Sequence, residues 1–314
     1  MNTKILVVIV ALAILIPVGG MVILSDEGGA VSGEFVIVDD RGKVFKFDDN
    51  PERIASLGKP FTNILIEIGA ADKIVAVDSW SEDFIEDYPD VDLANLSVGG
   101  SIFGLDVETV AERTPDLVIT YAYSSASVVT RIAAMEALGI SVIAFYPQSY
   151  GAVIKLVEEM GKVSGNTVEA QAAINDMAGT VIDIQTALAN VSDAQKPKVY
   201  FELASWGQST ANTGSVSDWL ITMAGGINVA QNASESSTYK PETETVMAWD
   251  VEIIVVEEKH PWTDAKLRTT YDNPDSDEPD VYRLSHGYNT YDLNLVNGLK
   301  QMAEYLHPEL FDFS

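Results

Sequence analysis

Short apolar runs alternate with segments of helical spacing along most of the chain. Residues 53–57 and 74–77 are two such runs, and Ile64, Leu65 and Ile68 between them recur at helical spacing. A strand, helix and strand in this order close as a parallel pair with a right-handed crossover. We therefore expect the loops after both strands to open on one edge of a sheet, where ligands bind in such folds.

The same alternation continues beyond this first unit. Asp106 is placed to cap a short helix that runs to Arg113. The further predicted elements are a helix over residues 128–138 and strands over residues 117–120, 140–145 and 199–203. This pattern predicts a doubly wound α/β fold.

One long helix is expected between the two halves of the chain. Residues 167–189 contain no proline, one glycine and apolar residues at helical spacing, with Asn166 and Glu169 spaced as a capping box. At 1.5 Å per residue, such a helix is about 34 Å long, which exceeds what a crossover in a small sheet requires. We interpret it as a spacer between two lobes.

The second half of the chain repeats the first. Residues 107–120 align without gaps on residues 243–256, which lie 136 positions later and share a Glu-Thr-Val core. Residues 65–71 fall on residues 220–226 at an offset of 155. Two matches in the same order favour two related lobes that face each other across a cleft.

The N-terminal segment is long and apolar enough to enter a membrane. Residues 5–24 carry no charge and reach the length of about 20 residues that a membrane span needs, which favours an uncleaved anchor. The alternative is a cleaved signal, for which the small residues of 28–33 offer a site. Under either interpretation residues from Ser25 onward lie outside the cytoplasm, and residues 25–33 form a flexible linker.

Composition narrows the function further. The 314 residues are 47% hydrophobic, which supports a folded protein, and the formal net charge of −28 argues against a nucleic-acid partner. Zero cysteines exclude disulfides, thiolate metal sites and a lipidated cysteine. The sequence has no G-x-S-x-G, HExxH or P-loop motif, so we expect neither enzyme activity nor a cofactor.

Several stretches together resemble the ABC-transporter substrate-binding proteins for iron-siderophores, haem and cobalamin. They are FVIVDDRGKVFKFDDNPERIASLG at residues 35–58, GAADKIVAV at 69–77, the stretch from Tyr200 that ends in AGGINVA, and NLVNGLKQMAEYLHPELF near the C-terminus. The resemblance covers residues 34–314, and residues 262–291 depart from it with an acidic, turn-rich insertion.

The resemblance implies two Rossmann-like lobes joined by the spacer helix, with a ligand cleft between them. The expected divisions are 1–33 for the membrane segment and linker, 34–165 for the N-terminal lobe, 166–191 for the spacer and 192–314 for the C-terminal lobe. It also implies that Glu108 and Glu244, one acid in the first turn of a helix in each lobe, contact arginines of a permease.

The ligand is expected at the loops that follow the strands. Flat aromatic rings there can stack on a large chelate or macrocycle. The candidate ligand-binding residues are Lys59, Pro60, Phe61, Trp80, Gly100, Ser101, Ile102, Tyr121, Tyr123, Trp206, Tyr239, His260 and Trp262. Gly100 enters this set because the family borders its cleft there, and His260 because it follows a strand end. Basic residues near these loops are few, which makes a strongly anionic ferric siderophore an awkward ligand.

We therefore expect an extracytoplasmic, monomeric receptor, held to the membrane by its N-terminal segment, that delivers a metal chelate to an ABC permease and its ATPase. Iron-siderophores and cobalamin-type corrinoids are the leading ligands, with haem behind them. The three scattered histidines make a receptor for a bare metal ion a poor match. The alternatives are a two-lobed enzyme such as a chelatase and a sensory ectodomain.

Overall fold

The computed structural model describes residues 34–82, 88, 91–203, 209–233, 238–273 and 277–313. All of them belong to one compact unit, which spans Ser32–Ser314. No helix in these ranges is long and apolar enough to cross a membrane, and the apolar segment 5–24 lies outside them.

The first half of this unit is built on a four-stranded parallel sheet in the order β4-β3-β5-β6. Its strands are β3 (Ile54–Leu57), β4 (Ile74–Val77), β5 (Leu117–Tyr121) and β6 (Ser141–Phe145). The predicted strand, helix and strand unit is confirmed as β3, α1 (Lys59–Glu67) and β4. Because β4 and β5 lie on opposite sides of β3, the strand order reverses at β3, and the loops that follow these parallel strands open at one sheet edge.

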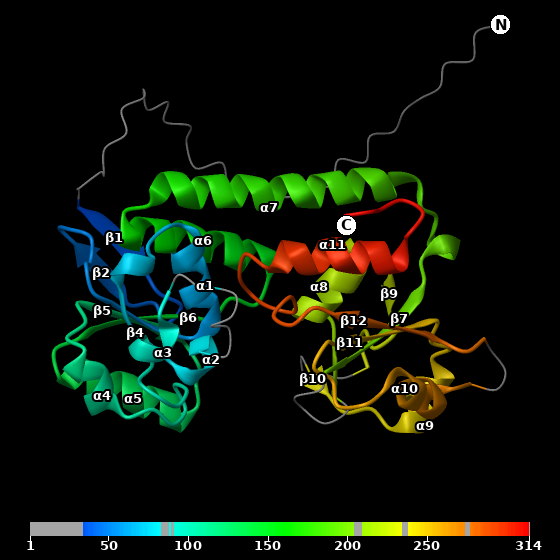
Figure 1. The fold of residues 1–314 in the computed structure, drawn as a ribbon, viewed down its shortest axis with the longest axis horizontal. Coiled ribbons are helices and arrows are strands. Elements are labelled where there is room, and N and C mark those ends of the chain that lie inside the picture. The colour runs from blue at the N-terminus through cyan, green and yellow to red at the C-terminus, as the bar shows by residue number, and fades with distance from the viewer. Residues whose placement is uncertain are drawn as a thin grey trace, which may run out of the picture. The chain divides into compact units, whose positions relative to one another are not determined.

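Helices cover both faces of this first sheet (Figure 1). Apolar side chains of α1 and α6 pack on one face, and those of α4 and α5 pack on the other. The helices are α2 (Ser79–Glu82), α3 (Leu93–Leu96), α4 (Val107–Glu112), α5 (Ala126–Ala137) and α6 (Tyr150–Ser164), with the 3-10 turn η1 (Ala71–Lys73). Asp106 caps α4 as predicted, because its side chain accepts the Glu108 amide at 3.0 Å.

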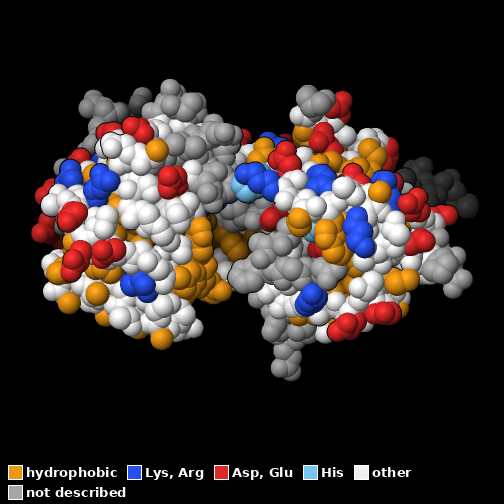
Figure 2. All heavy atoms as spheres, turned by 60° about the horizontal axis from the view of Figure 1, so that its bottom comes forward, with side chains coloured by type: hydrophobic (Ala, Val, Ile, Leu, Met, Phe, Trp, Pro, Cys, Tyr) orange, Lys and Arg blue, Asp and Glu red, His pale blue; other side chains and the backbone are white. Residues whose placement is uncertain are grey.

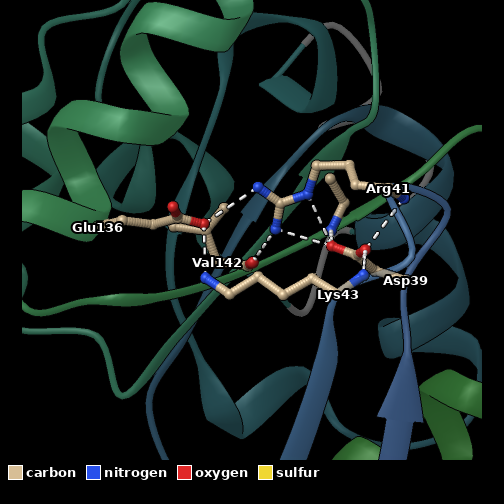
Figure 3. A network of polar contacts seen from close by, with 6 residues as sticks. Asp39, Arg41, Lys43, Glu136 and Val142 are labelled. Atoms are coloured by element: carbon tan, nitrogen blue, oxygen red, sulfur yellow. Dashed lines mark hydrogen bonds and ion pairs between the residues drawn. The ribbon is translucent and has the colours of Figure 1, made fainter.

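An N-terminal hairpin, β1 (Phe35–Val38) and β2 (Val44–Phe47), is fastened to the free edge of β6 (Figure 3). The buried Asp39 carboxylate accepts the Arg41 Nε at 2.7 Å, the Lys43 amide at 2.9 Å and the Ala144 amide at 3.2 Å. Arg41 and Lys43 both reach Glu136 of α5, each at 3.0 Å. The turn thereby satisfies backbone groups of β6 that no neighbouring strand pairs.

A long helix, α7 (Thr167–Ala187), runs along both halves of the unit with α6 and α11 (Leu295–Leu306) beneath it (Figure 1). The predicted spacer is confirmed, and it lies against α6, a helix that was not predicted from the sequence. The predicted capping box is wrong: Asn166 makes no capping bond, and its Nδ2 donates to the Ile68 carbonyl at 2.7 Å.

The second half is built on a mixed sheet in the order β10-β8-β7-β11-β12, with β9 beside β7. β9, β11 and β12 run parallel to β7, whereas β8 pairs antiparallel with β7 and β10 pairs antiparallel with β8. The strands are β7 (Lys198–Leu203), β8 (Ser209–Ala211), β9 (Ile227–Asn228), β10 (Thr238–Tyr239), β11 (Ile253–Glu257) and β12 (Asp280–Leu284). The helices are α8 (Val216–Met223), α9 (Thr243–Ala248) and α10 (Asp264–Tyr271), with 3-10 turns η3 (Leu188–Asn190) and η4 (Asp193–Gln195).

The internal repeat is visible in the elements. Helix α9 and strand β11 begin 136 positions after α4 and β5, as the first sequence match predicts. The second match is one residue out of register, because the helix ends are equivalent at Gly69 and Gly225. Each of these glycines has a positive φ, 79° and 84°, and donates to a carbonyl three residues earlier.

A single hydrophobic core joins the two halves. Met177, Val181 and Ile184 of α7 belong to the same buried cluster as Ile64 of α1 and Leu299 of α11. Separating the halves would expose this shared apolar surface to water. The arrangement therefore favours a nearly fixed cleft over wide opening.

Candidate functional site

A cleft of about 480 Å³ lies between the loops at the carboxyl edges of the two sheets. This volume is within the range of small-molecule sites. The first half contributes Lys59, Pro60, Trp80 and Tyr121, and the second contributes Leu203, Ala211, Ser215, Val216, Ser217, Thr238, Glu257, Asn289, Thr290 and Tyr291. The ligand cleft expected between two Rossmann-like lobes is therefore present.

Five aromatic side chains form a continuous wall on the first half. We call Trp80, Phe103, Tyr121, Tyr123 and Tyr146 the aromatic wall, and the fully buried Phe61 packs on Tyr121 behind it. Tyr123 stacks on Tyr121 with the ring centroids 4.8 Å apart and on Phe103 with the centroids 5.2 Å apart. The Trp80 ring makes T-shaped contacts with Tyr121 and with Phe103. Figure 2 shows apolar side chains gathered beside the groove on this half of the molecule. The wall offers a broad surface for a flat ligand.

Two glycines allow this wall to form. Gly58 has a φ of 147°, and a Cβ added there would lie 2.6 Å from the Tyr121 ring, so a side chain would displace that ring. Gly100 has a φ of 66°, and its carbonyl accepts the Ser79 amide at 3.0 Å. That bond fastens the loop of Phe103 to the helix that carries Trp80.

Tyr121 and Tyr123 of the wall are neutral hydrogen-bond donors at neutral pH. Burial, followed by the charges of Tyr146 and Tyr291, raises the pKa of Tyr123 to about 12. Burial, followed by the charges of Tyr123, Asp78 and Asp292, raises the pKa of Tyr121 well above its usual value. These phenols therefore keep their protons and can donate to a ligand acceptor.

The opposite side of the cleft carries a cluster of polar groups beside the apolar Leu203, Ala211 and Val216. We call Ser215, Ser217, Glu257, Asn289, Thr290 and Tyr291 the polar wall. Asn289 connects two elements in it, because its Oδ1 accepts the Ser217 hydroxyl at 3.0 Å and its Nδ2 donates to Glu257 Oε1 at 3.3 Å. Ser215 caps α8 by accepting the Asp218 amide at 3.1 Å.

Lys59 joins the two walls at the floor of the cleft. Its ammonium donates to the Gly287 carbonyl at 2.9 Å and lies 3.7 Å from the fully buried carboxylate of Asp292. Thr290 Oγ1 and the Asn294 amide also donate to Asp292, at 2.8 and 2.9 Å. Burial raises the pKa of Asp292, and the nearby Lys59 opposes this shift. The lysine is thus engaged in holding residues 287–292 against the first half.

Four of the predicted ligand-binding residues, Lys59, Pro60, Trp80 and Tyr121, line the cleft. Tyr123 continues the aromatic wall beside them. Phe61 and Ile102 are fully buried and support the loops from beneath, whereas the exposed neighbour of Ile102 is Phe103. The Ser101 carbonyl accepts the Gly104 and Leu105 amides in the turn that carries Phe103, and the Gly100 carbonyl accepts the Ser79 amide.

The structure places other candidates away from the cleft. His260 is buried, and its Nε2 lies 3.0 Å from Glu202 Oε1, on the face of the second sheet that α10 covers. Trp262 packs on that same face with Lys266 over its ring, so neither residue lines the cleft. The Tyr239 hydroxyl donates to the Ala230 carbonyl at 3.2 Å, and Trp206 lies outside the described residues.

Glu257, Asn289, Thr290, Tyr291 and Phe103 line or adjoin the cleft without having been predicted. A signal existed for Glu257, because the repeat offset of 136 places it opposite Tyr121 at the end of the equivalent strand. Within the described ranges, no group of three or more His, Cys, Asp or Glu side chains is arranged to hold a metal ion.

Glu108 and Glu244, the predicted docking acids, occupy equivalent surface positions. Each is exposed in the first turn of a six-residue helix, α4 or α9, one helix in each half. Their equivalence follows from the same offset of 136 that relates the strands behind them.

The comparisons with known proteins agree with this architecture. A family profile described as "Periplasmic binding protein" matches residues 54–276. A cobalamin-binding protein of Halobacterium salinarum is 26% identical over 233 residues, which cover 74% of this chain and 60% of that protein. The chain thus spans less than two thirds of the length of this relative.

Two further matches extend over more of the chain. An uncharacterized ABC transporter substrate-binding lipoprotein of Bacillus subtilis is 24% identical over 276 residues, covering 83% of this chain and 82% of that protein. The crystal structure of a periplasmic solute binding protein from Veillonella parvula superposes with a TM-score of 0.72 at 22% identity, over 90% of this chain and 89% of the other. The resemblance inferred from the sequence is therefore confirmed, the enzyme alternative is not supported, and the chain belongs to the periplasmic binding protein family.

Proposed function

We propose that this protein is the substrate-binding component of an ABC importer and that it captures a cobalamin-type corrinoid outside the cytoplasm. The observation that carries the proposal is a cleft of about 480 Å³ that is lined by Trp80 and Tyr121 of the aromatic wall on one half and by the polar wall on the other. A corrin ring has a flat face for stacking and a fringe of uncharged amides. Those amides match hydroxyl, amide and carboxylate partners such as Ser217, Asn289 and Glu257.

Competing chelates fit this cleft less well. Haem carries two carboxylates, and ferric catecholates are strongly anionic, so each requires basic partners. Lys59 is the one basic side chain among the described residues that line the cleft, and its ammonium already contacts Gly287 and Asp292. The name of the Halobacterium relative, a cobalamin-binding protein, supports the same choice.

The test is a titration of the full-length protein with cyanocobalamin, haemin and a ferric siderophore, followed by tryptophan fluorescence and visible absorption. Cyanocobalamin should quench the emission saturably. Trp80→Ala should weaken its binding by about threefold to tenfold, since aromatic stacking contributes about 0.5–1.5 kcal/mol. Trp262→Ala is the matched control and should leave the affinity unchanged. Tight binding of a bare divalent ion or a sugar, with no response to any chelate, would overturn the proposal.

We also propose that Glu108 and Glu244 dock the loaded protein on the permease. Their exposure in equivalent first turns supports this, although acids are favourable at helix N-termini for structural reasons alone. Changing both to Ala should abolish uptake into cells while the ligand affinity stays the same. Glu112→Ala with Glu252→Ala removes as many charges and should leave uptake intact. Undiminished uptake by the Glu108 and Glu244 double variant would refute the docking role.

We propose that residues 5–24 stay attached as a membrane anchor, that the lobes span 34–165 and 192–314 around the spacer 166–191, and that the protein is a monomer. The length and apolar character of residues 5–24 support the first of these. Mass spectrometry of the native protein should find an N-terminus near Met1; a mature chain that begins near Val31 would contradict an anchor.

A further inference from the structure

Glu257 presents a carboxylate to the cleft at the end of β11. It is partly exposed and lines the cleft opposite Tyr121, its counterpart in the internal repeat. Its Oε1 accepts the Asn289 Nδ2 at 3.3 Å, and no side chain in the described part of the chain bonds to its Oε2. One carboxylate oxygen is therefore available to a ligand.

Two further carboxylates lie behind the floor of the cleft. Asp292 is fully buried beside Lys59, and Asp78 is fully buried at the end of β4, where its Oδ1 accepts the Ser81 hydroxyl at 2.9 Å. Both lie close enough to Tyr121 for their charges to act on its hydroxyl. Of these charged groups, Glu257 and Lys59 line the cleft, and the two buried carboxylates act on a ligand there only through their electric field, which burial protects from screening by salt.

We propose that Glu257 contacts the ligand and selects it by charge. Its Oε2 accepts a hydrogen bond from an N–H donor of the ligand or pairs with a cationic group, and the carboxylates of the floor disfavour anionic chelates. This inference rests on the proposed function only in taking the cleft as the site where the transported chelate binds. Like charges brought together at a binding site are costly, so a carboxylate here also lowers the affinity for anionic ligands.

The experiment uses one corrin ring in three charge states with the full-length protein. The probes are aquacobalamin, which is cationic, cyanocobalamin, which is neutral, and the cyanocobalamin derivative in which three peripheral amides are hydrolysed to carboxylates. The wild-type affinity should be at least about tenfold lower for the tricarboxylate than for the neutral ligand, a cost of about 1.4 kcal/mol. Glu257→Gln should reduce that ratio to within about threefold.

Glu278→Gln is the matched control. Glu278 is exposed ahead of β12, at the edge of the same sheet that lies away from the cleft, and its change removes the same charge. The control should keep the wild-type ratio. Equal wild-type affinity for the neutral and tricarboxylate ligands would overturn the inference, as would equal effects of the two variants.

A parallel series of iron chelates separates this inference from the proposed function. It compares a cationic ferric trihydroxamate that carries a free amine, a neutral ferric trihydroxamate and a ferric tricatecholate. Binding of iron chelates without corrinoids would overturn the corrinoid proposal, and the affinity order within the iron series would still support or overturn charge selection by Glu257. Failure to bind either series would overturn both.

Discussion

At the scale of single residues, the Lys59–Asp292 ion pair links the two halves of the molecule at the cleft. Asp292 is fully buried and the Lys59 side chain is 13% exposed, so solvent screens their attraction little. A buried pair contributes modestly relative to apolar replacements, whereas loss of one partner leaves a buried charge uncompensated. Lys59 therefore stabilises the folded state mainly by compensating the buried charge of Asp292.

We predict that Lys59→Met lowers the free energy of unfolding by about 3 kcal/mol and that adding Asp292→Asn restores most of this loss. The reason is that the second change removes the orphaned charge while keeping a partner for Thr290. Urea denaturation of the ligand-free protein measures both values. Lys43→Met, which breaks an exposed pair with Glu136, is the control and should cost less than about 1 kcal/mol. A double variant no more stable than Lys59→Met would contradict the mechanism.

Individual site residues could be predicted only where they directly follow a strand whose direction in the sheet is known. Lys59, Trp80 and Tyr121 follow the ends of parallel strands, and strand order brings those ends together. His260 also follows a strand end, but the chain turns under the sheet and the buried Glu202 binds it. Residues 287–292 have no periodicity and depart from the family pattern, so their approach to Lys59 could not be predicted.

At the scale of elements, the two halves repeat a helix and strand but cap the helix differently. Asp106 at the N-cap of α4 accepts the Glu108 amide, whereas Glu242 at the N-cap of α9 makes no capping bond. Both residues have extended backbone angles, so the difference lies in the length of the side chain. Aspartate reaches the N2 and N3 amides and glutamate does not do so readily.

We predict that Asp106→Ala destabilises the protein by about 1 kcal/mol and that Glu242→Asp stabilises it by up to about 1 kcal/mol. The gain arises because a shorter carboxylate can accept a free amide in the first turn of α9. Glu242→Gln, which keeps the length of the side chain, should give no gain. Urea denaturation checks all three variants, and a Glu242→Asp protein no more stable than wild type would show that α9 needs no cap.

Most helices and strands were predictable because each depends on the spacing of apolar residues within its own segment of the sequence. Helix α6 was missed although Val153, Leu156, Val157 and Met160 recur at helical spacing and are buried in the structure. The capping box at Asn166 failed for a different reason. Its amide binds the Ile68 carbonyl, which lies 98 residues earlier in the chain, and such a contact leaves no trace in the local pattern.

At the scale of the whole molecule, the net charge of −28 opposes folding. The chain has 47 acidic residues and 19 basic ones, so even complete pairing of the basic groups would leave most carboxylates without a cationic partner. Compaction brings these like charges together and destabilises the folded state. Several ion pairs that do form, such as Lys196 with Asp193 and Lys198 with Asp250, lie at the surface and contribute little.

We therefore predict that the free energy of unfolding rises as KCl is increased from about 0.1 M to about 1 M, because the screening length falls from about 10 Å to about 3 Å. Urea denaturation is the suitable measurement, since urea carries no charge of its own. Screening should produce most of its effect in the lower half of this range, whereas exclusion of salt from the surface strengthens steadily with concentration. Replacing surface acids distant from the cleft, such as Glu278, by Lys should flatten the salt dependence while leaving the Glu257 charge preference intact. A stability that is unchanged or lower in KCl would mean that self-repulsion does not limit this fold.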